Sequence, residues 1–147
     1  MRTTSPEENK ALVRRFAEAV NTGNHDLLDE IVAPDFVRHC QATPEVNVRS
    51  LADFRQFDAD SRATFPDQRI DAEHLVAEGD SVAFYCRYTG TQRGPMGPFP
   101  PSGKRMEVDF AGVFRVADGK LAELWVTWDN LAGLVQLGHF PPPAPQG

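Results

Sequence analysis

The stretch RMEVDFAGVFRVADGKLAELWVTW, residues 105–128, decides the fold. It holds two runs rich in β-forming residues, and Asp118-Gly119 between them is a strong signal for a tight hairpin turn. The stretch 69–90 repeats this arrangement around a turn at Glu78-Gly79-Asp80. The second half of the chain is therefore expected to form a sheet of antiparallel hairpins. The four strands are expected at 69–77, 81–90, 105–116 and 120–128.

The first half of the chain has helical periodicity instead. Ser5, Pro6 and Glu8 predict a helix start with a capping box, and Asn21-Thr22-Gly23 predicts its end. Similar patterns of start signals, apolar spacing and stop signals mark the remaining elements. Three helices are expected at 5–22, about 25–32 and 50–65, an extended segment at 35–39, and a short last helix at 129–138.

Helices followed by hairpins predict an α+β architecture, with three N-terminal helices packed on one face of a curved antiparallel sheet. Such a sheet, curled around its helices, leaves a cone whose cavity can take a small ligand. A single domain is expected over residues 1–140, followed by a Pro-rich tail, 141–147, that we expect to be disordered. The loop GPMGPFPPSG, residues 94–103, is interpreted as a flap over the mouth, with Met96 and Phe99 touching the ligand.

Composition excludes several classes of function. The 147 residues carry a net charge of −6, and an acidic chain without a basic stripe is a poor partner for nucleic acid. We expect no membrane segment and a cytoplasmic location, because the sequence shows neither a long apolar run nor a leader. Cys40 and Cys86 are expected to be reduced thiols. No zinc, nucleotide or serine-hydrolase motif is present, so no metal or cofactor site is predicted.

A set of short motifs resembles one known family. In chain order they are Asn21-Thr22-Gly23, Ala33-Pro34-Asp35-Phe36, Phe65-Pro66-Asp67, Thr89-Gly90-Thr91, Pro101-Ser102-Gly103-Lys104, Phe114-Arg115-Val116, Asp118-Gly119-Lys120-Leu121, Trp128-Asp129-Asn130-Leu131 and Gln136-Leu137-Gly138. Their order and spacing across roughly residues 8–138 resemble the SnoaL-like polyketide cyclases. The resemblance implies a cone of the nuclear-transport-factor-2-like (NTF2-like) type, a small hydrophobic substrate, no metal or organic cofactor, and a homodimer formed through the exposed sheet face.

The resemblance also implies where the family's aldol-cyclase residues would stand. The catalytic aspartate falls on Val126, and the paired glutamine and histidine fall on Phe110 and Gly112. Valine cannot accept a proton, so the aldol mechanism does not carry over directly. If these positions face the cavity, as the resemblance implies, strand alternation gives the rest of the expected inward phase. It comprises Met106, Val108, Phe110, Gly112 and Phe114 on one strand and Leu124, Val126 and Trp128 on the next, with the indole N–H of Trp128 as the polar group.

Three side chains are candidates for acid–base chemistry, each with a structural alternative. Asp58 shares a helix face with Phe54 and is expected to point into the cone, unless it is surface charge. His39 suits proton transfer, although a histidine at a strand end is often a structural hydrogen-bonding residue. Asp129 directly precedes the last helix and fits an N-cap. Further candidates for substrate contact are Phe16, Val20, Arg38, Phe54, Phe57, Tyr85 and Tyr88, with the phase of the last two left open.

Three functional hypotheses follow. The leading one is a cofactor-independent cyclase that folds a polyketide-derived chain in an apolar cavity, with a [4+2] cycloaddition as one such closure. The second is an acid–base enzyme, namely an aldol cyclase, isomerase, dehydratase or epoxide hydrolase, working through Asp58, His39 or Asp129. The third is a protein that binds a hydrophobic ligand without turning it over.

Overall fold

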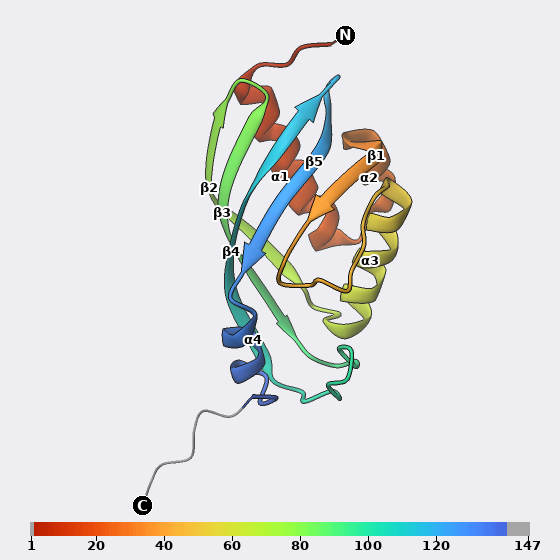
Figure 1. The fold of residues 1–147 in the computed structure, drawn as a ribbon, viewed down its shortest axis with the longest axis vertical. Coiled ribbons are helices and arrows are strands. Elements are labelled where there is room, and N and C mark those ends of the chain that lie inside the picture. Colours follow the sequence, from red (N-terminus) through yellow and green to blue (C-terminus); the bar gives the residue numbers. More distant parts are fainter. Residues whose placement is uncertain (1, 141–147) are drawn as a thin grey trace, which may run out of the picture.

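The computed structural model describes residues 2–140 and has the expected α+β architecture. Four helices accompany a five-stranded sheet whose strand order is β1-β5-β4-β3-β2. The helices lie on one side of a long curved sheet, and α4 follows the end of β5 (Figure 1). The elements are α1 (Pro6–Thr22), α2 (His25–Ile31), β1 (Val32–His39), α3 (Leu51–Thr64), β2 (Arg69–Glu78), β3 (Ser81–Thr91), β4 (Arg105–Ala117), β5 (Lys120–Trp128) and α4 (Asn130–Gln136).

Local side-chain chemistry fixes the helix ends. Ser5 accepts a hydrogen bond from the backbone N–H of Glu8, and the Glu8 carboxylate accepts one from the backbone N–H of Ser5, so α1 begins with the predicted capping box. Gly23 ends α1 in the left-handed conformation, at φ 72°. Ser50 caps α3 by accepting from the N–H of Asp53. The predicted helices are therefore confirmed, each within about two residues.

Strands β2 to β5 form the predicted antiparallel meander. The β4–β5 turn places Asp118 and Gly119 at φ 52° and 77°, the two positive angles that a type I′ turn needs. One feature was not anticipated. The segment after α2 is a full strand, Val32–His39, and it pairs parallel with β5 at the edge of the sheet. Pro34 is tolerated there because an edge strand leaves one row of its backbone groups unpaired.

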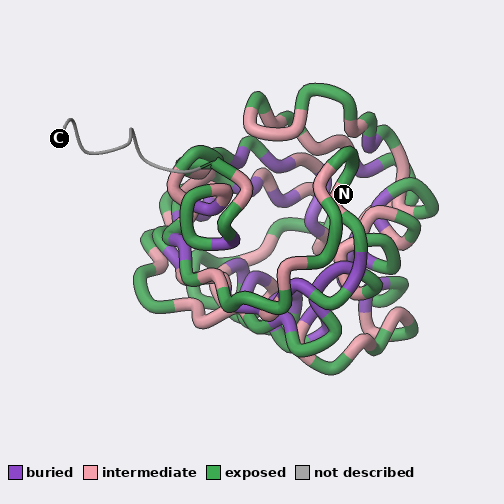
Figure 2. Tube along the Cα trace, turned by 90° about the horizontal axis from the view of Figure 1, so that it is seen from below, coloured by how far each residue is buried: buried purple, intermediate pink, exposed green. Residues whose placement is uncertain are grey.

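The core lies between the helices and the inner face of the sheet. Phe36, Leu28 and Ile31 are fully buried, and Phe16 of α1 packs against Phe114 of β4 with ring centroids 5.2 Å apart. Along much of β3 and β5, buried positions alternate with less buried ones. The view down the long axis shows buried segments inside the molecule and exposed loops around its outline (Figure 2). One face of the sheet is thus committed to the interior and the other to the surface.

Three further expectations concern the Pro-rich tail, membrane-spanning helices and the two cysteines. The predicted disorder of the Pro-rich tail, 141–147, lies outside the described residues. Within residues 2–140, no helix is long and apolar enough to cross a membrane. Cys40 and Cys86 are both free thiols, as expected.

Candidate functional site

A cavity of about 830 Å³ lies between the helices and the inner face of the sheet. A volume of this size suits a drug-sized organic molecule. Its walls come from α1, α3, the inner faces of all five strands, and loops. Two of these loops lie at its opening. Exposed lining residues of these loops, Glu45 and Asn47 in one and Pro95 and Gly97 in the other, mark where the cavity meets solvent.

The β4–β5 wall is apolar. Register pairs Phe110 with Trp128 and Phe114 with Leu124, so side chains of the two strands share the inner face. The residues of the expected inward phase that line the cavity are Met106, Val108, Phe110, Phe114, Leu124, Val126 and Trp128. Val126, on which the resemblance placed the family's aspartate, therefore contributes an apolar side chain to the cavity wall.

Gly112 does not line the cavity, and the reason is a close approach between backbones. A Cβ atom built on Gly112 would lie 2.0 Å from the carbonyl oxygen of Trp125 and 2.8 Å from the ring of Phe84. Any side chain at position 112 would collide with β5. The close packing of β4 against β5 therefore allows only glycine at position 112. The expectation that Gly112 contacts substrate is wrong.

Strand β3 resolves which of its two tyrosines faces inward. Tyr88 lines the cavity, together with Phe84 and Cys86 of the same phase. Tyr85 points outward, where it is 48% exposed and donates a hydrogen bond to Asp109 at 2.9 Å. The expected contact between Tyr85 and substrate is therefore wrong, because adjacent strand residues lie on opposite faces.

Helix residues complete the apolar lining. The predicted contacts Phe16, Val20, Phe54 and Phe57 all border the cavity. Phe54 sits among the other rings, 5.1 Å from Phe16 and 5.9 Å from Phe57 between ring centroids. These residues belong to the core and to the cavity wall at once, as happens when a core is built around a ligand space.

Asp58 is buried at the cavity wall with both oxygens occupied. Its Oδ1 accepts from the Nε2 of Gln68 at 3.0 Å, its Oδ2 lies 2.8 Å from the Nε2 of His25, and Arg62 adds a charge at 3.7 Å. The Asp58 side chain is 3% exposed. A buried carboxylate with a hydrogen-bond partner on each oxygen and an ion pair beside it is strongly positioned.

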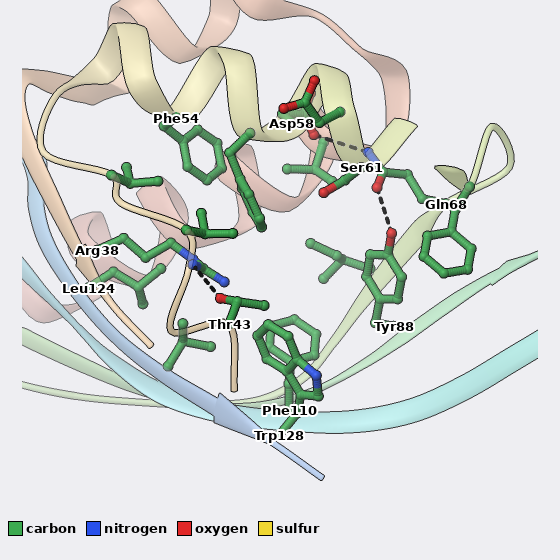
Figure 3. Close-up of a pocket in the computed structure, with 18 of the residues that line it drawn as sticks. Arg38, Thr43, Phe54, Asp58, Ser61, Gln68, Tyr88, Phe110, Leu124 and Trp128 are labelled. Carbon is green, nitrogen blue, oxygen red and sulfur yellow. Dashed lines mark hydrogen bonds between the residues drawn. The ribbon is translucent and has the colours of Figure 1, made fainter. Parts of the chain in front are cut away.

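The same network continues to Tyr88. Its hydroxyl donates to the Oε1 of Gln68 at 2.6 Å, which links Tyr88 to Asp58 through one amide (Figure 3). Burial, and then the nearby Asp58 carboxylate, raise the pKa of Tyr88. Tyr88 is thus a neutral phenol at physiological pH, and its ring presents an apolar face to the cavity.

Arg38 brings a positive charge into this apolar space from β1. It pairs with Leu124 in the β1–β5 register and so shares the inward phase of that residue. Its guanidinium carbon lies 4.3 Å from the ring centroid of Phe57 and 5.7 Å from that of Trp128. In Figure 3, Arg38 and Tyr88 enter the cavity from different strands. Burial lowers the pKa of Arg38, although a guanidinium keeps its proton at neutral pH.

His39 and Asp129, two of the three acid–base candidates, lie outside the cavity. His39 follows Arg38 in the strand and therefore points to the outer face, where it stacks on Trp125 and lies 2.7 Å from Glu123. The hydrogen bond from His39 lowers the pKa of Glu123. Asp129 caps α4 by accepting from the N–H of Ala132 at 3.0 Å. Both residues have the structural role that was the alternative in each case.

The loop 94–103 is held by one buried amide. Gln92 is fully buried, and its Nε2 donates to the carbonyl oxygens of Gly94 and Pro100, each at 3.1 Å. Met96 reaches the cavity as expected. Phe99 does not; its ring packs instead on His139, 5.0 Å away between centroids. The predicted ligand contact of Phe99 is therefore wrong.

Sequence reasoning missed the partners of Asp58. Gln68 and His25 stand 10 and 33 residues away in the chain and belong to no recognisable motif. Only the burial of Asp58 on an apolar helix face could have suggested that such partners exist, since a buried carboxylate needs donors. No cluster of three His, Cys, Asp or Glu side chains able to hold a metal occurs among residues 2–140.

Comparisons with known proteins agree with this geometry. The sequence model of the family described as SnoaL-like polyketide cyclase matches residues 10–137. No curated protein matches the sequence. The chain is similar to the solved structure of TsrD from Streptomyces laurentii, with 28% identity, a TM-score of 0.83, and coverage of 93% of this chain and 99% of the other.

Two further solved structures are similar. A candidate polyketide cyclase from Streptomyces antibioticus, IdmH, shares 31% identity at a TM-score of 0.78 and covers 88% of this chain and 98% of its own. A candidate SnoaL-like polyketide cyclase from Jannaschia sp. CCS1 shares 28% identity at a TM-score of 0.82 and covers 97% of this chain and 100% of its own. The similarity therefore extends over the whole cone.

Proposed function

The chain belongs to the SnoaL-like polyketide cyclase family, and on that premise we propose that it is an enzyme that closes a ring in a polyketide-derived intermediate. The observation that carries the proposal is the cavity of about 830 Å³, which is lined by apolar side chains such as Val126 and Phe110. Such a lining favours a reaction driven by the shape of the bound substrate, without metal or organic cofactor.

Shape-driven closure works by removing conformational freedom. A flexible polyene samples many conformers in water, and only a few bring its reacting carbons together. Holding it in a reactive fold can remove about 7–11 kcal/mol of the barrier. A [4+2] cycloaddition fits this setting, because a diene and an alkene form two carbon–carbon bonds with no proton, electron or leaving group exchanged.

Two donors at the wall can assist such a closure. The guanidinium of Arg38 has N–H groups at the cavity, and among residues 2–140 no side chain accepts a hydrogen bond from the indole N–H of Trp128. A hydrogen bond to a carbonyl conjugated with the alkene withdraws electron density from it and lowers the barrier. Such preorganised donors act more strongly where water is excluded.

The test is conversion of linear polyene intermediates by the purified protein, followed by liquid chromatography and mass spectrometry. A cycloaddition product has the mass of its substrate, whereas an aldol condensation loses water. Val126→Trp projects a large ring into the cavity and should reduce turnover roughly a hundredfold by misplacing the substrate. Thr127→Trp is the matched control, because the neighbouring residue is exposed and points outward. Equal turnover in both variants would refute a shape-driven mechanism.

Acid–base catalysis is the second candidate, and the Asp58 network is the observation that favours it. Asp58 with His25 forms a carboxylate–imidazole pair at 2.8 Å, and Asp58 borders the cavity. If Asp58→Asn abolishes turnover in folded protein while His39→Ala and Asp129→Asn retain it, this candidate replaces the shape-driven one. If no intermediate is converted by any form, the protein is a binder of hydrophobic ligands.

A homodimer through the outer sheet face is part of the proposal. Strand register places one apolar row across this face, here called the outer row, formed by Val76, Ala83, Val113 and Trp125. Its large members are 36–69% exposed. Sedimentation should show a dimer at micromolar concentration and a monomer for Trp125→Glu. Leu131→Glu, at an exposed site on α4, should remain dimeric; a monomeric parent protein would refute the interface.

We also propose that the enzyme acts in the cytoplasm. Free thiols such as Cys40 and Cys86 persist in a reducing compartment. Cell fractionation of the native producer, with detection by antibody, tests this directly. Recovery with the secreted proteins would contradict it.

A further inference from the structure

Arg38 differs from the other arginines of the chain in what surrounds it. Eight arginines among residues 2–140 have a carboxylate oxygen within 4.0 Å: Arg2, Arg15, Arg55, Arg62, Arg69, Arg87, Arg105 and Arg115. Three of the others, Arg14, Arg49 and Arg93, are exposed to water. Arg38 alone combines a half-buried side chain with the absence of a carboxylate partner in this part of the chain.

Two aromatic rings and two small polar side chains surround the guanidinium of Arg38. Phe57 and Trp128 lie at 4.3 and 5.7 Å between the guanidinium carbon and the ring centroids, which is cation–π distance. On its edge, the hydroxyl of Thr43 lies 3.3 Å from NH1, and the thiol of Cys40 is a second side-chain partner. A guanidinium has five N–H donors, so several remain for a ligand.

The backbone holds this cation in place before any ligand arrives. The N–H of Arg38 donates to the carbonyl oxygen of Val48 at 3.1 Å, and its strand pairs with β5 at Leu124. The side chain thus rises from an ordered strand against two rings. A charge kept away from its counter-charge in an apolar cavity is costly, and the cost falls when an anion enters.

The carboxylates nearest in the lining do not fill this role. Glu45 is exposed and has no contact with Arg38 within ion-pair distance. The Asp53 carboxylate accepts from the backbone N–H of Arg49, and the backbone N–H of Asp53 donates to the hydroxyl of Ser50, which caps α3. Asp58 is held by the side chains of Gln68 and His25 and by the charge of Arg62. The anion that completes the site must therefore come from the ligand.

We propose that Arg38 binds a two-oxygen anionic group of the substrate, a carboxylate or the enolate of a 1,3-dicarbonyl, so that the cavity selects acidic intermediates over neutral ones of equal length. The carbon skeleton assumed here rests on the proposed cyclase function; the charge selection does not. The planar guanidinium edge matches two oxygens held in one plane. Arg38 is in this respect the specificity-determining residue of the site.

Binding of matched probes tests the proposal without any turnover. Decanoate and decan-1-ol share a chain and differ in charge, and 2-decanoylcyclohexane-1,3-dione supplies an enolate that is anionic at neutral pH. Calorimetry at pH 7.5 gives each affinity. Trp128 fluorescence in a Trp125→Phe background gives an independent readout, because Trp125 lies on the outer face. At least one anionic probe should bind roughly tenfold to a hundredfold tighter than decan-1-ol.

Variants assign that preference to one residue. Arg38→Met should abolish the preference for the anion while decan-1-ol affinity stays within about threefold, since methionine keeps the apolar contacts. Arg38→Lys should retain part of it, because lysine keeps the charge and loses the planar edge. Arg93→Met, at an exposed arginine without a carboxylate partner in residues 2–140, is the matched control and should behave as the parent.

Each result of these binding measurements either supports or overturns the proposal. A preference for only one of the two anions identifies which group the substrate carries. Equal affinity of the parent for both anions and the alcohol overturns the proposal, and so does a preference that persists in Arg38→Met. Should Arg38→Met fail to fold, the parent ratio and Arg38→Lys still decide it. Failure of the cyclase assay leaves these affinities unchanged, so the two proposals stand or fall separately.

Discussion

Replacing Asp58 by alanine removes a carboxylate that three other side chains converge on. The side chain is 3% exposed, and its oxygens lie 2.8 Å from His25 Nε2, 3.0 Å from Gln68 Nε2 and 3.7 Å from Arg62. Hydrogen bonds to a charged group contribute about 1.5–3 kcal/mol each, and breaking a buried ion pair by removing one partner costs about 3–5 kcal/mol. We therefore expect Asp58→Ala to lower the free energy of unfolding by about 3–5 kcal/mol.

Thermal unfolding followed by circular dichroism measures this effect. For a chain of this size 1 kcal/mol shifts the melting temperature by about 2–4 °C, so the expected decrease is roughly 6–20 °C. Asp60→Ala is the matched control, because Asp60 is exposed on the same helix and, among residues 2–140, its carboxylate accepts a hydrogen bond only from Gln56. The control should stay within about 0.5 kcal/mol of the parent. If Asp58→Ala melts like Asp60→Ala, the network does not stabilise the fold as argued.

The remaining predictions concern Gly112, Cys86 and Asp129. Gly112→Ala should destabilise the protein by about 2 kcal/mol or more in urea unfolding, since its Cβ would lie 2.0 Å from the Trp125 carbonyl oxygen; an unchanged midpoint would contradict the close approach. Burial raises the pKa of Cys86 to about 11, so at pH 8 a thiol reagent should modify Cys40 first and Cys86 only after denaturation. Because the raised pKa favours the neutral thiol in the folded state, this contribution to stability is complete below about pH 8.5 and is lost as pH rises to 11; Cys86→Ala should flatten that decline. Asp129→Ala should cost about 1 kcal/mol through loss of the helix cap, and a loss of turnover in the still-folded variant would contradict a purely structural role.

The sequence predicted the apolar wall but not the polar groups set into it. Alternation along β4 and β5 grouped Phe110, Val126 and Trp128 on one face, because side chains on a strand alternate with period two, and the family resemblance indicated that this face is the inner one. The same rule could not decide between Tyr85 and Tyr88. Their phase depends on which face of β3 the helices cover, and that is a property of the packed sheet.

Strand β1, which supplies the cation Arg38, is a second case in which the sequence offered candidates and the packed sheet decided between them. Sequence suggested both Arg38 and His39 as site residues, and neighbours in a strand cannot both face inward. The parallel pairing of β1 with β5 sets Arg38 opposite Leu124 and His39 opposite Trp125, and thereby sends the first inward and the second outward. No local pattern encodes a parallel pairing between segments more than eighty residues apart.

The hairpin at residues 105–128 is the part of the fold that the sequence determined by itself. Its turn, its strand lengths and the alternation of its side chains follow from residues close together in the chain, as do the Ser5, Ser50 and Asp129 caps. Tertiary structure alone decided that Arg38 has no carboxylate partner among residues 2–140. It also decided that His25, Gln68 and Arg62 surround the carboxylate of Asp58. Those facts depend on which distant side chains meet in a low-dielectric interior, where the free energy of a charge is set by its neighbours in space.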